Sequence, residues 1–336
     1  MRSENRLERW EILVRSGERF SDFQPYVPAI DDAGDVVFQA ARVDGGTGVY
    51  VWQRGLVEEL LSYPAEGVVA SHPDRNTRGD VCVYLAREDT SSALVGVHAG
   101  KPIVYADTRA GSFRSIGPLG PVIDEAGRVG FRATRADGGE AICLWADGEI
   151  RGLATTLTDF SRFHGLPVMA GDAGLVFRAD RPDGMQGVYL ARQAEVVPVF
   201  ERRAGEGEVA FFPTMNSSGV IACGWVDPAA EAHVLTVSPA GVCREVDTGA
   251  LRFRSLRGFM LSAAGELLFT GTPEGGQLGV YRVGERGAEC LLALGDELDG
   301  GVVSGFALNP VSINAGGQVV VRILFEDGGQ VIAMHG

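Results

Sequence analysis

Arginine and histidine side chains recur just before a short turn that this 336-residue sequence repeats along its length. Guanidinium groups bind carboxylates and phosphates through paired hydrogen bonds, so several of them together would form a site for an anion. The polar residues differ from copy to copy, which favours a functional role. Pairing with neighbouring carboxylates, which would only rigidify the structure, is the alternative. The candidate ligand-binding residues are Asp22, Gln24, Arg114, Arg162, Arg254, Arg257 and Asn309, accompanied by Ser71, His72 and His164.

Two of the five histidines, His72 and His164, belong to this set. The pKa of histidine lies near neutrality, so both are candidate general acid/base catalysts. With Asp22 or Asp74 they could also bind a divalent metal, although no third clear ligand accompanies them. A hydrogen-bonded structural role is the alternative for each, and the sequence identifies no cofactor. The remaining histidines are expected on third strands or in the terminal tail: His98, His233 and His335.

A sevenfold repeat must position these side chains. Each copy contains an apolar segment, a turn and a β-branched segment, as in residues 28–38 (PAIDDAGDVVF). The turn reads Asx-x-x-Gly in five copies, and Gly171 and Ser262 replace the Asx in the other two. Asn or Asp starts such a turn through side-chain hydrogen bonds, and glycine supplies the positive φ. The turn glycines stand at positions 34, 79, 127, 174, 219, 265 and 317, so successive copies are 45 to 52 residues apart.

Two further strands follow in each copy. A second glycine turn leads to a third strand, such as residues 48–51 (GVYV), and then to a fourth, such as residues 57–61 (VEELL). Four antiparallel strands per repeat form a propeller blade. The sequence therefore predicts an all-β, seven-bladed β-propeller with four-stranded antiparallel blades in one domain. Phenylalanines recur near the start of the first strand, where we expect them to fill the gap between adjacent blades.

The two chain ends indicate how the ring closes. The last copy reaches residues 331–334 (VIAM) after three strands, and an additional strand at residues 10–14 (WEILV) precedes the first copy. We expect the N-terminal strand to complete the C-terminal blade, which leaves no blade edge exposed. The expected blades span about residues 20–64, 65–110, 111–159, 160–205, 206–250, 251–300, and 301–336 with 7–17.

The Asx-x-x-Gly phrase with its following Phe, and the later Gly-Gly-x-x-Gly-Val-Tyr, resemble the bacterial tandem-repeat family named for its NxxGxxAF motif. The similarity covers the whole chain and is closest at Asp31–Phe38, Asp124–Phe131 and Gly171–Phe177. It implies a repeat and a β-propeller fold, and it implies no catalytic residues. Many members of that family are exported and anchored, whereas no signal segment is evident in this sequence.

Composition and charge narrow the classes of partner. The formal charge of −14 argues against binding to nucleic acid or to an anionic membrane. The five cysteines form no CxxC pair and mostly lie in apolar runs, which is typical of small buried residues in a reducing compartment. No apolar signal core or membrane-length run is present, so we expect a cytoplasmic protein.

Three functions fit these observations. The first is binding of a small anionic molecule or peptide at an Arg/His-rich mouth of the central channel, because the first strand of each blade should line that channel. In the second, the same mouth catalyses an acid/base reaction, as a lyase or hydrolase would. The third is a non-catalytic scaffold that binds a protein partner through its rim. Compact blades with short loops favour the first function, and the sequence leaves open whether the protein is an enzyme.

Overall fold

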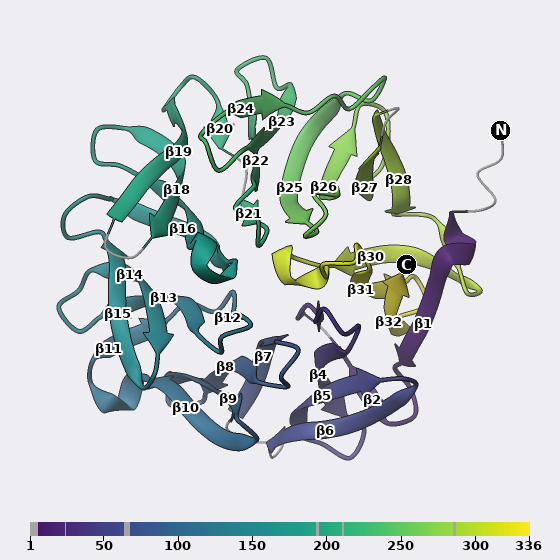
Figure 1. The fold of residues 1–336 in the computed structure, drawn as a ribbon. Helices are drawn as coiled ribbons and strands as arrows, with labels where there is room; N and C mark the ends of the chain where they lie inside the picture. The colour runs from purple at the N-terminus through teal and green to yellow at the C-terminus, as the bar shows by residue number, and fades with distance from the viewer. Residues whose placement is uncertain (1–5, 24, 64–67, 193–194, 210–211, 285–286) are drawn as a thin grey trace.

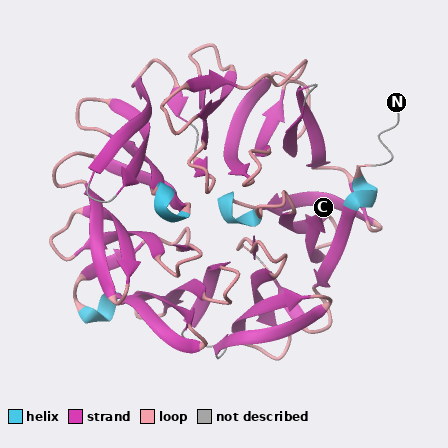
Figure 2. Cartoon of the chain, viewed as in Figure 1, coloured by secondary structure: helices cyan, strands magenta, loops and turns pink. Residues whose placement is uncertain are grey.

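Seven antiparallel β-sheets are arranged radially around a central axis (Figures 1 and 2). The computed structural model describes residues 6–23, 25–63, 68–192, 195–209, 212–284 and 287–336. Within each sheet, successive strands of the chain lie side by side and pair antiparallel from the axis outward. The predicted fold class, an all-β seven-bladed propeller, is confirmed.

The first strand consists of two short strands in blades 1, 3 and 5, and it contains a bulge in blades 2, 4 and 6. Blade 1 contains β2 (Phe20–Asp22), β3 (Ala29–Ile30), β4 (Val36–Arg42), β5 (Thr47–Gln53) and β6 (Leu56–Tyr63). Blade 2 contains β7 (Val68–Arg75), β8 (Val81–Arg87), β9 (Ser92–His98) and β10 (Lys101–Asp107). Blade 3 contains β11 (Phe113–Ile116), β12 (Val122–Ile123), β13 (Val129–Arg135), β14 (Glu140–Ala146) and β15 (Glu149–Thr155). Blade 4 contains β16 (Arg162–Met169), β17 (Leu175–Asp180), β18 (Met185–Arg192) and β19 (Glu195–Arg203).

The second half of the chain repeats this order. Blade 5 contains β20 (Glu208–Val209), β21 (Thr214–Met215), β22 (Ile221–Val226), β23 (Ala232–Val237) and β24 (Cys243–Glu245). Blade 6 contains β25 (Phe253–Leu261), β26 (Leu267–Pro273), β27 (Gly279–Gly284) and β28 (Gly287–Ala293). Blade 7 contains β29 (Glu297–Leu298), β30 (Gly301–Ala307), β31 (Val319–Phe325), β32 (Gln330–His335) and β1 (Trp10–Arg15). The sequence-based boundaries assign residues 297–298 to the sixth repeat, but β29 pairs with β30.

Only short 3-10 helices interrupt the strands in the described residues. These are η2 (Leu7–Arg9), η3 (Thr108–Ala110), η4 (Gly171–Ala173) and η5 (Pro310–Ser312). No helix in this part of the chain is long and apolar enough to cross a membrane.

The N-terminal strand closes the ring, as predicted. β1 pairs antiparallel with β32, from Trp10 opposite His335 to Arg15 opposite Val331 (Figure 1). The indole of Trp10 donates a hydrogen bond to the carbonyl of Leu291 in blade 6, 3.2 Å away. His335 is therefore part of a strand, contrary to its expected place in a tail, and its ring is buried against Trp10.

The hydrophobic core is divided into layers between neighbouring blades. In the layer between blades 7 and 1, Phe20 and Phe38 pack with Tyr50 against Val320 and Ile332. The rings of Phe38 and Tyr50 are stacked 5.8 Å apart, and Phe20 meets Tyr50 edge-on at 4.7 Å. Phe160, Phe177 and Tyr189 in blade 4 repeat this arrangement against blade 3. The recurrent aromatics thus fill the gaps between blades.

The Asx turns fix the loops that surround the axis. The side-chain oxygen of Asn216 accepts hydrogen bonds from the backbone of Ser218 and Val220, which closes its own turn. Its amide donates to the carbonyl of Ser262 in the next blade. Asn76 and Asn314 make the equivalent bonds to the next blades. All seven turn glycines have positive φ, between 76° and 114°, as the repeat requires.

Candidate functional site

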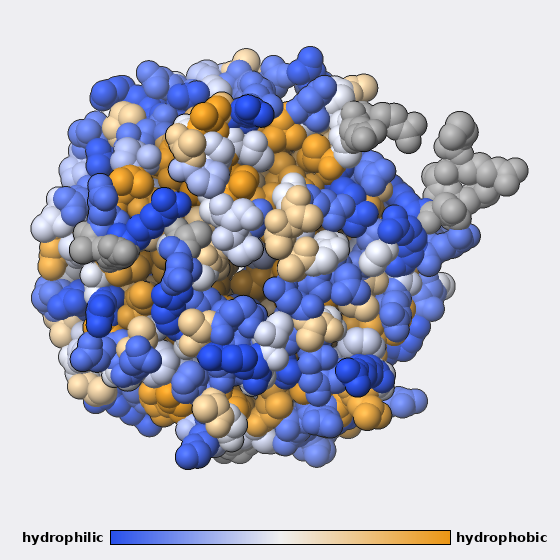
Figure 3. Space-filling view, in the orientation of Figure 1, coloured by the Kyte–Doolittle hydropathy of each residue, from blue (hydrophilic) through white to orange (hydrophobic). Residues whose placement is uncertain are grey.

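A cavity of about 290 Å³ lies at the axis of the propeller, where the first strands end in their Asx turns. Figure 3 shows the molecule hollowed at its centre, with apolar atoms in the depth of the hollow. All seven blades contribute to the wall. The residues that directly precede the turns are Ile30, Arg75, Ile123, Ala170, Met215, Leu261 and Ile313.

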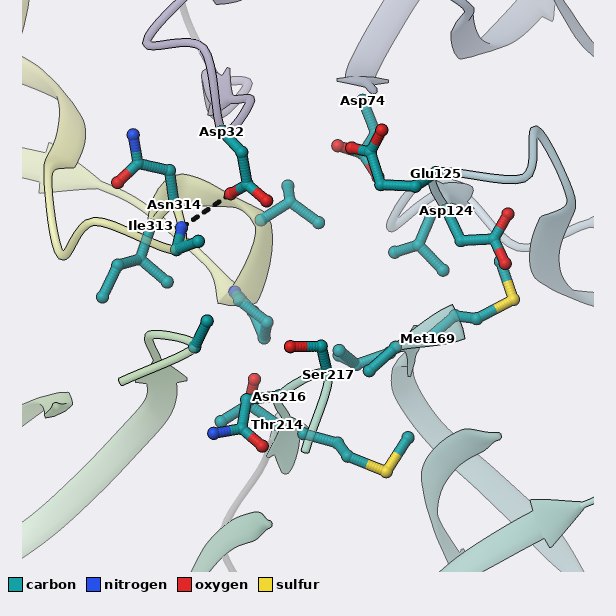
Figure 4. A pocket seen from close by; sticks show the side chains of 18 of the residues that line it. Asp32, Asp74, Asp124, Glu125, Met169, Thr214, Asn216, Ser217, Ile313 and Asn314 are labelled. Carbon is teal, nitrogen blue, oxygen red and sulfur yellow. Dashed lines mark hydrogen bonds between the residues drawn. The ribbon is translucent and has the colours of Figure 1, made fainter. Parts of the chain in front are cut away.

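The wall of this central cavity is acidic on one side, and the other side combines methionines with uncharged polar residues such as Asn216 and Ser217 (Figure 4). Blades 4 and 5 contribute Met169, Met215 and Thr214. Blades 1 to 3 contribute the acidic residues, which are Asp31, Asp32, Asp74, Asp124 and Glu125.

Two of the five carboxylates form ion pairs with arginine. Arg75 donates from Nε to Asp31 and from Nη2 to Asp35, each at 2.9 Å. Arg128 contacts Asp124 at 2.7 Å. Arg75 is thus committed to carboxylates of blade 1 and is not available to an anionic ligand in the cavity.

Asp74 is a buried carboxylate in the wall. It accepts hydrogen bonds from the backbone nitrogens of Ile123, at 2.7 Å, and Arg75, at 2.9 Å. Burial raises its pKa to about 7, and the nearby charges of Glu125 and Asp31 act in the same direction. Close to neutral pH this group can therefore gain or lose a proton.

None of the predicted mouth residues that the structure describes lines the central cavity. Arg254 and Arg257 instead lie together in a second pocket of about 660 Å³ between blades 5 and 6. Arg257 and Asn309 also line a smaller pocket, of about 230 Å³, on the other side of β25. Of the candidate ligand-binding residues, Arg254, Arg257 and Asn309 thus lie near one another, away from the axis.

The pocket between blades 5 and 6, called here the arginine pocket, combines charge with apolar surface. The side chains of Arg254 and Arg257 form no hydrogen bond or ion pair within the described part of the chain. Phe212 forms part of the wall and has a φ of 56°, a conformation that costs free energy for a residue other than glycine. The other lining residues are Gly207, Glu208, Val226, Asp227, Pro228, Ala230, Ser255 and Leu256.

The two candidate histidines occupy different positions in their blades. His72 lies in the bulge of β7 with a φ of 48°, and its ring meets that of Tyr26 at 5.3 Å. Burial lowers its pKa to about 4, so the ring is neutral at pH 7. His164 precedes the bulge of β16, and its Nε2 lies 2.7 Å from the carboxylate of Asp180. Burial lowers the pKa of His164 too, although Asp180 opposes this effect.

The remaining candidates are dispersed. Asp22 accepts a hydrogen bond from Gln330 in blade 7. Arg114 is exposed and donates to the carbonyl of Ala136. Arg162 is exposed at the start of β16, and the backbone of Ser71 pairs with Tyr84.

The last two candidate residues are Asn309 and Gln24. Asn309 is buried and caps η5 through a hydrogen bond from the Val311 nitrogen, which is a structural task. Gln24 lies outside the described residues.

The described residues contain no group of three or more His, Cys, Asp or Glu side chains that could hold a metal ion. The five cysteines are free in this structure. Cys82, Cys143 and Cys223 are buried, whereas Cys243 is exposed and Cys290 lies between these extremes.

Comparison with known proteins shows the fold alone. No family model and no curated protein matches the sequence, so the resemblance to the NxxGxxAF family stays a prediction. Among solved structures, an oligogalacturonate lyase from Vibrio parahaemolyticus is 12% identical with a TM-score of 0.64, over 97% of this chain and 96% of that one. A chain of a mitotic checkpoint complex has a TM-score of 0.56 at 15% identity, over 100% and 94%. A prolyl endopeptidase has a TM-score of 0.60 at 14% identity, over 90% of this chain and 46% of its own.

Proposed function

We propose that the protein binds a small anionic molecule, or the acidic end of a peptide, in the arginine pocket. The observation that carries this proposal is the presence of two arginines without a protein partner, Arg254 and Arg257, in one pocket large enough for a small molecule. Guanidinium groups recognise carboxylate and phosphate through paired hydrogen bonds.

The acidic residues of the arginine pocket do not neutralise its arginines. Glu208 lies 3.8 Å from Arg178. Asp227 faces His233 at 3.6 Å and accepts a hydrogen bond from the Glu231 nitrogen. The wall thus offers unpaired positive charge beside the apolar surface of Phe212 and Leu256, in a protein whose net charge is −14.

Calorimetric titration with digalacturonate, a sugar phosphate and a short acidic peptide tests this function. Digalacturonate is included because one structural neighbour is an oligogalacturonate lyase. Removing one arginine by Arg254→Ala or Arg257→Ala should weaken binding by about tenfold or more, because hydrogen bonds to charged groups contribute about 1.5–3 kcal/mol. Arg114→Ala is the matched control, since Arg114 occupies the same repeat position outside the pocket.

Equal losses of affinity in Arg114→Ala and Arg254→Ala would contradict the proposal, because only general electrostatics would then be at work. The scaffold function would be favoured if no probe bound and a partner protein were retained equally by the wild type and by the double arginine variant.

The His164–Asp180 hydrogen bond favours a second candidate function, acid/base catalysis on the bound anion. A carboxylate that orients a histidine is the usual support for a general base. The residue after His164 supports this candidate, because a Cβ added to Gly165 would lie 3.3 Å from the ring of Phe212 in the wall of the arginine pocket. His72, by contrast, has its pKa lowered to about 4 and faces Tyr26.

Turnover of digalacturonate tests the catalytic candidate. His164→Ala should abolish turnover and leave the affinity for digalacturonate nearly unchanged. His98→Ala is the control, because His98 also faces a carboxylate, Asp80 at 3.5 Å, but lies on β9 away from the pocket. Turnover that survives His164→Ala would exclude this role.

A further inference from the structure

We propose that the central cavity is a second binding site, for a small organic cation that carries an apolar body, such as a protonated primary amine. This site goes beyond the proposed function. It differs from the arginine pocket in position, in the residues that line it and in the charge of its ligand.

The acidic side of the central cavity holds three carboxylates without a cationic partner in the described residues. Asp32 accepts a hydrogen bond from the backbone nitrogen of Ala315, at 2.6 Å. Asp74 accepts from two backbone nitrogens. Glu125 accepts from the nitrogen and the hydroxyl of Thr77. All these donors are uncharged, so the negative charge of this wall is not neutralised locally, and it favours a cation.

A residue in the opposite wall of the cavity independently indicates a ligand. Thr214 lines the central cavity with only 2% of its surface exposed, and its hydroxyl forms no hydrogen bond within the described residues. Because this hydroxyl opens on the cavity, a bound ligand can form the hydrogen bond that the protein does not provide. Thr214 lies across the cavity from the carboxylates (Figure 4).

The shape and the remaining wall define the chemical class of the ligand. Met169 and Met215 provide flexible apolar contacts next to Thr214. A volume of about 290 Å³ admits one aromatic ring with a short chain, since a cavity of about 150 Å³ holds benzene. Phenylethylammonium therefore fits the cavity in charge, size and polarity.

The test titrates the full-length protein with 2-phenylethylamine, with 2-phenylethanol as its neutral analogue and with 3-phenylpropanoate as its anionic analogue. The methyl NMR signals of the methionines report the position of each probe. The amine should shift the signals of Met169 and Met215 and leave that of Met185, on β18, unchanged. The alcohol should bind at least about fivefold more weakly and the propanoate should not bind.

Conservative variants identify the residues that recognise the cation. Asp32→Asn and Glu125→Gln should each weaken amine binding by about two- to fivefold, the range expected for partly exposed ion pairs. Thr214→Val keeps the shape and removes the hydroxyl, so it should weaken binding as well. Glu58→Gln, an exposed change on β6, is the matched control and should have no effect. The melting temperature of each variant shows whether its fold is retained.

The dependence of binding on pH supplies a second readout. Asp74 is packed beside Asp31, Arg75, Glu125 and Cys82. Its raised pKa of about 7 means that it is neutral in acid and charged in alkali. The amine stays protonated across this range, so its affinity should rise from about pH 5.5 to about pH 8.5. Asp74→Asn should flatten that rise.

Three results would overturn the second site. They are the absence of shifts at Met169 and Met215, equal affinity for the amine and the alcohol, and unchanged affinity in both Asp32→Asn and Glu125→Gln. Displacement of the amine by calcium at a stoichiometric concentration would show an inorganic cation site instead. Each of these results leaves the arginine pocket untouched, because its tests use anions and different residues.

Discussion

Asp74 stands at a position of the first strand that holds alanine in blade 1, valine in blade 3 and methionine in blade 4. A carboxylate there is buried in the cavity wall, and the hydrogen bonds to its charged form come from two backbone nitrogens. Burying an ionised carboxylate costs free energy, so the neutral form is favoured and its pKa rises to about 7. A residue that contributes only to packing would be apolar, as in blades 1, 3, 4 and 6, whereas blades 5 and 7 hold Thr214 and Ser312.

The first prediction concerns the pH dependence of stability. An unfolded Asp loses its proton near pH 4, but folded Asp74 keeps it until about pH 7. Asp74 therefore makes its full contribution to the free energy of unfolding below about pH 4, and this contribution is lost as the pH rises from about 4 to 7. A difference of about three units between the folded and unfolded pKa corresponds to a loss of at most about 4 kcal/mol in the free energy of unfolding.

Chemical denaturation of the wild type and of Asp74→Asn at several pH values checks this prediction. The stability of the variant relative to the wild type should increase from pH 4 to pH 8, whatever its absolute value. A constant difference across this range would mean that Asp74 titrates normally.

At the scale of the elements, the Asx turns act both within a blade and between blades. The oxygen of Asn216 closes its own turn, and its amide reaches the carbonyl of Ser262. An aspartate in the same place can close the turn but cannot donate to the next blade. Asp31 and Asp124 accordingly make other links, through Arg75 and Arg128. This division of tasks gives a physical reason for asparagine in the repeated turn.

The second prediction separates the two tasks of Asn216. Asn216→Ser retains an oxygen that can close the turn, as Ser262 does in blade 6, but removes the bond between blades. It should lower the unfolding free energy by about 1 kcal/mol. Asn216→Asp should lower it further, because a buried carboxylate would face the Ser262 carbonyl. Denaturation of both variants measures the difference, and wild-type stability in Asn216→Ser would show that the link between blades contributes nothing.

The fold could be predicted from the sequence because its signals are local. Each turn needs a glycine with positive φ within four residues of its Asx, and the strands between turns are short and regular. The prediction of the site from the same repeat was wrong. We expected the whole first strand to line the channel, but it is interrupted in six of the blades, and in these only the residues after the interruption line the central cavity. Figure 1 shows the early half of this strand, β2 and β11, farther from the centre than β12.

One signal for the central cavity was present in the sequence. Asp74 and Arg75 introduce two charges into a strand segment that is apolar in blades 1, 3 and 6. The meeting of Arg254 and Arg257 in one pocket depends on how blades 5 and 6 pack, which no repeat spacing reveals. The inequivalence of His72 and His164 likewise depends on where each bulge falls.

At the scale of the whole molecule, β1 covers the outer edge of β32 and so holds the first and last segments of the chain together. Its contacts extend beyond the pairing, because Trp10 bonds to blade 6 and Arg15 forms an ion pair with Asp299. Without β1, the edge of β32 would present unpaired backbone groups to solvent and to other chains.

The third prediction is that deletion of residues 1–17 strongly lowers stability and promotes self-association. Denaturation and light scattering would measure the two effects. Adding a peptide of residues 6–17 should restore the monomer and part of the lost stability, because it can pair with β32. Deletion of residues 1–5 alone is the control. A 1–17 deletion that unfolds like the intact protein would show that the ring does not depend on its closing strand.

Pairing of β1 with β32 also places the two ends of the fold next to each other, with Trp10 opposite His335. The chain could therefore begin at a different blade while the blades keep the same arrangement around the axis. A short linker could connect the present ends, and new ends could be opened in the connection between any two blades. Such circular permutants should keep all seven layers between blades, with both pockets intact.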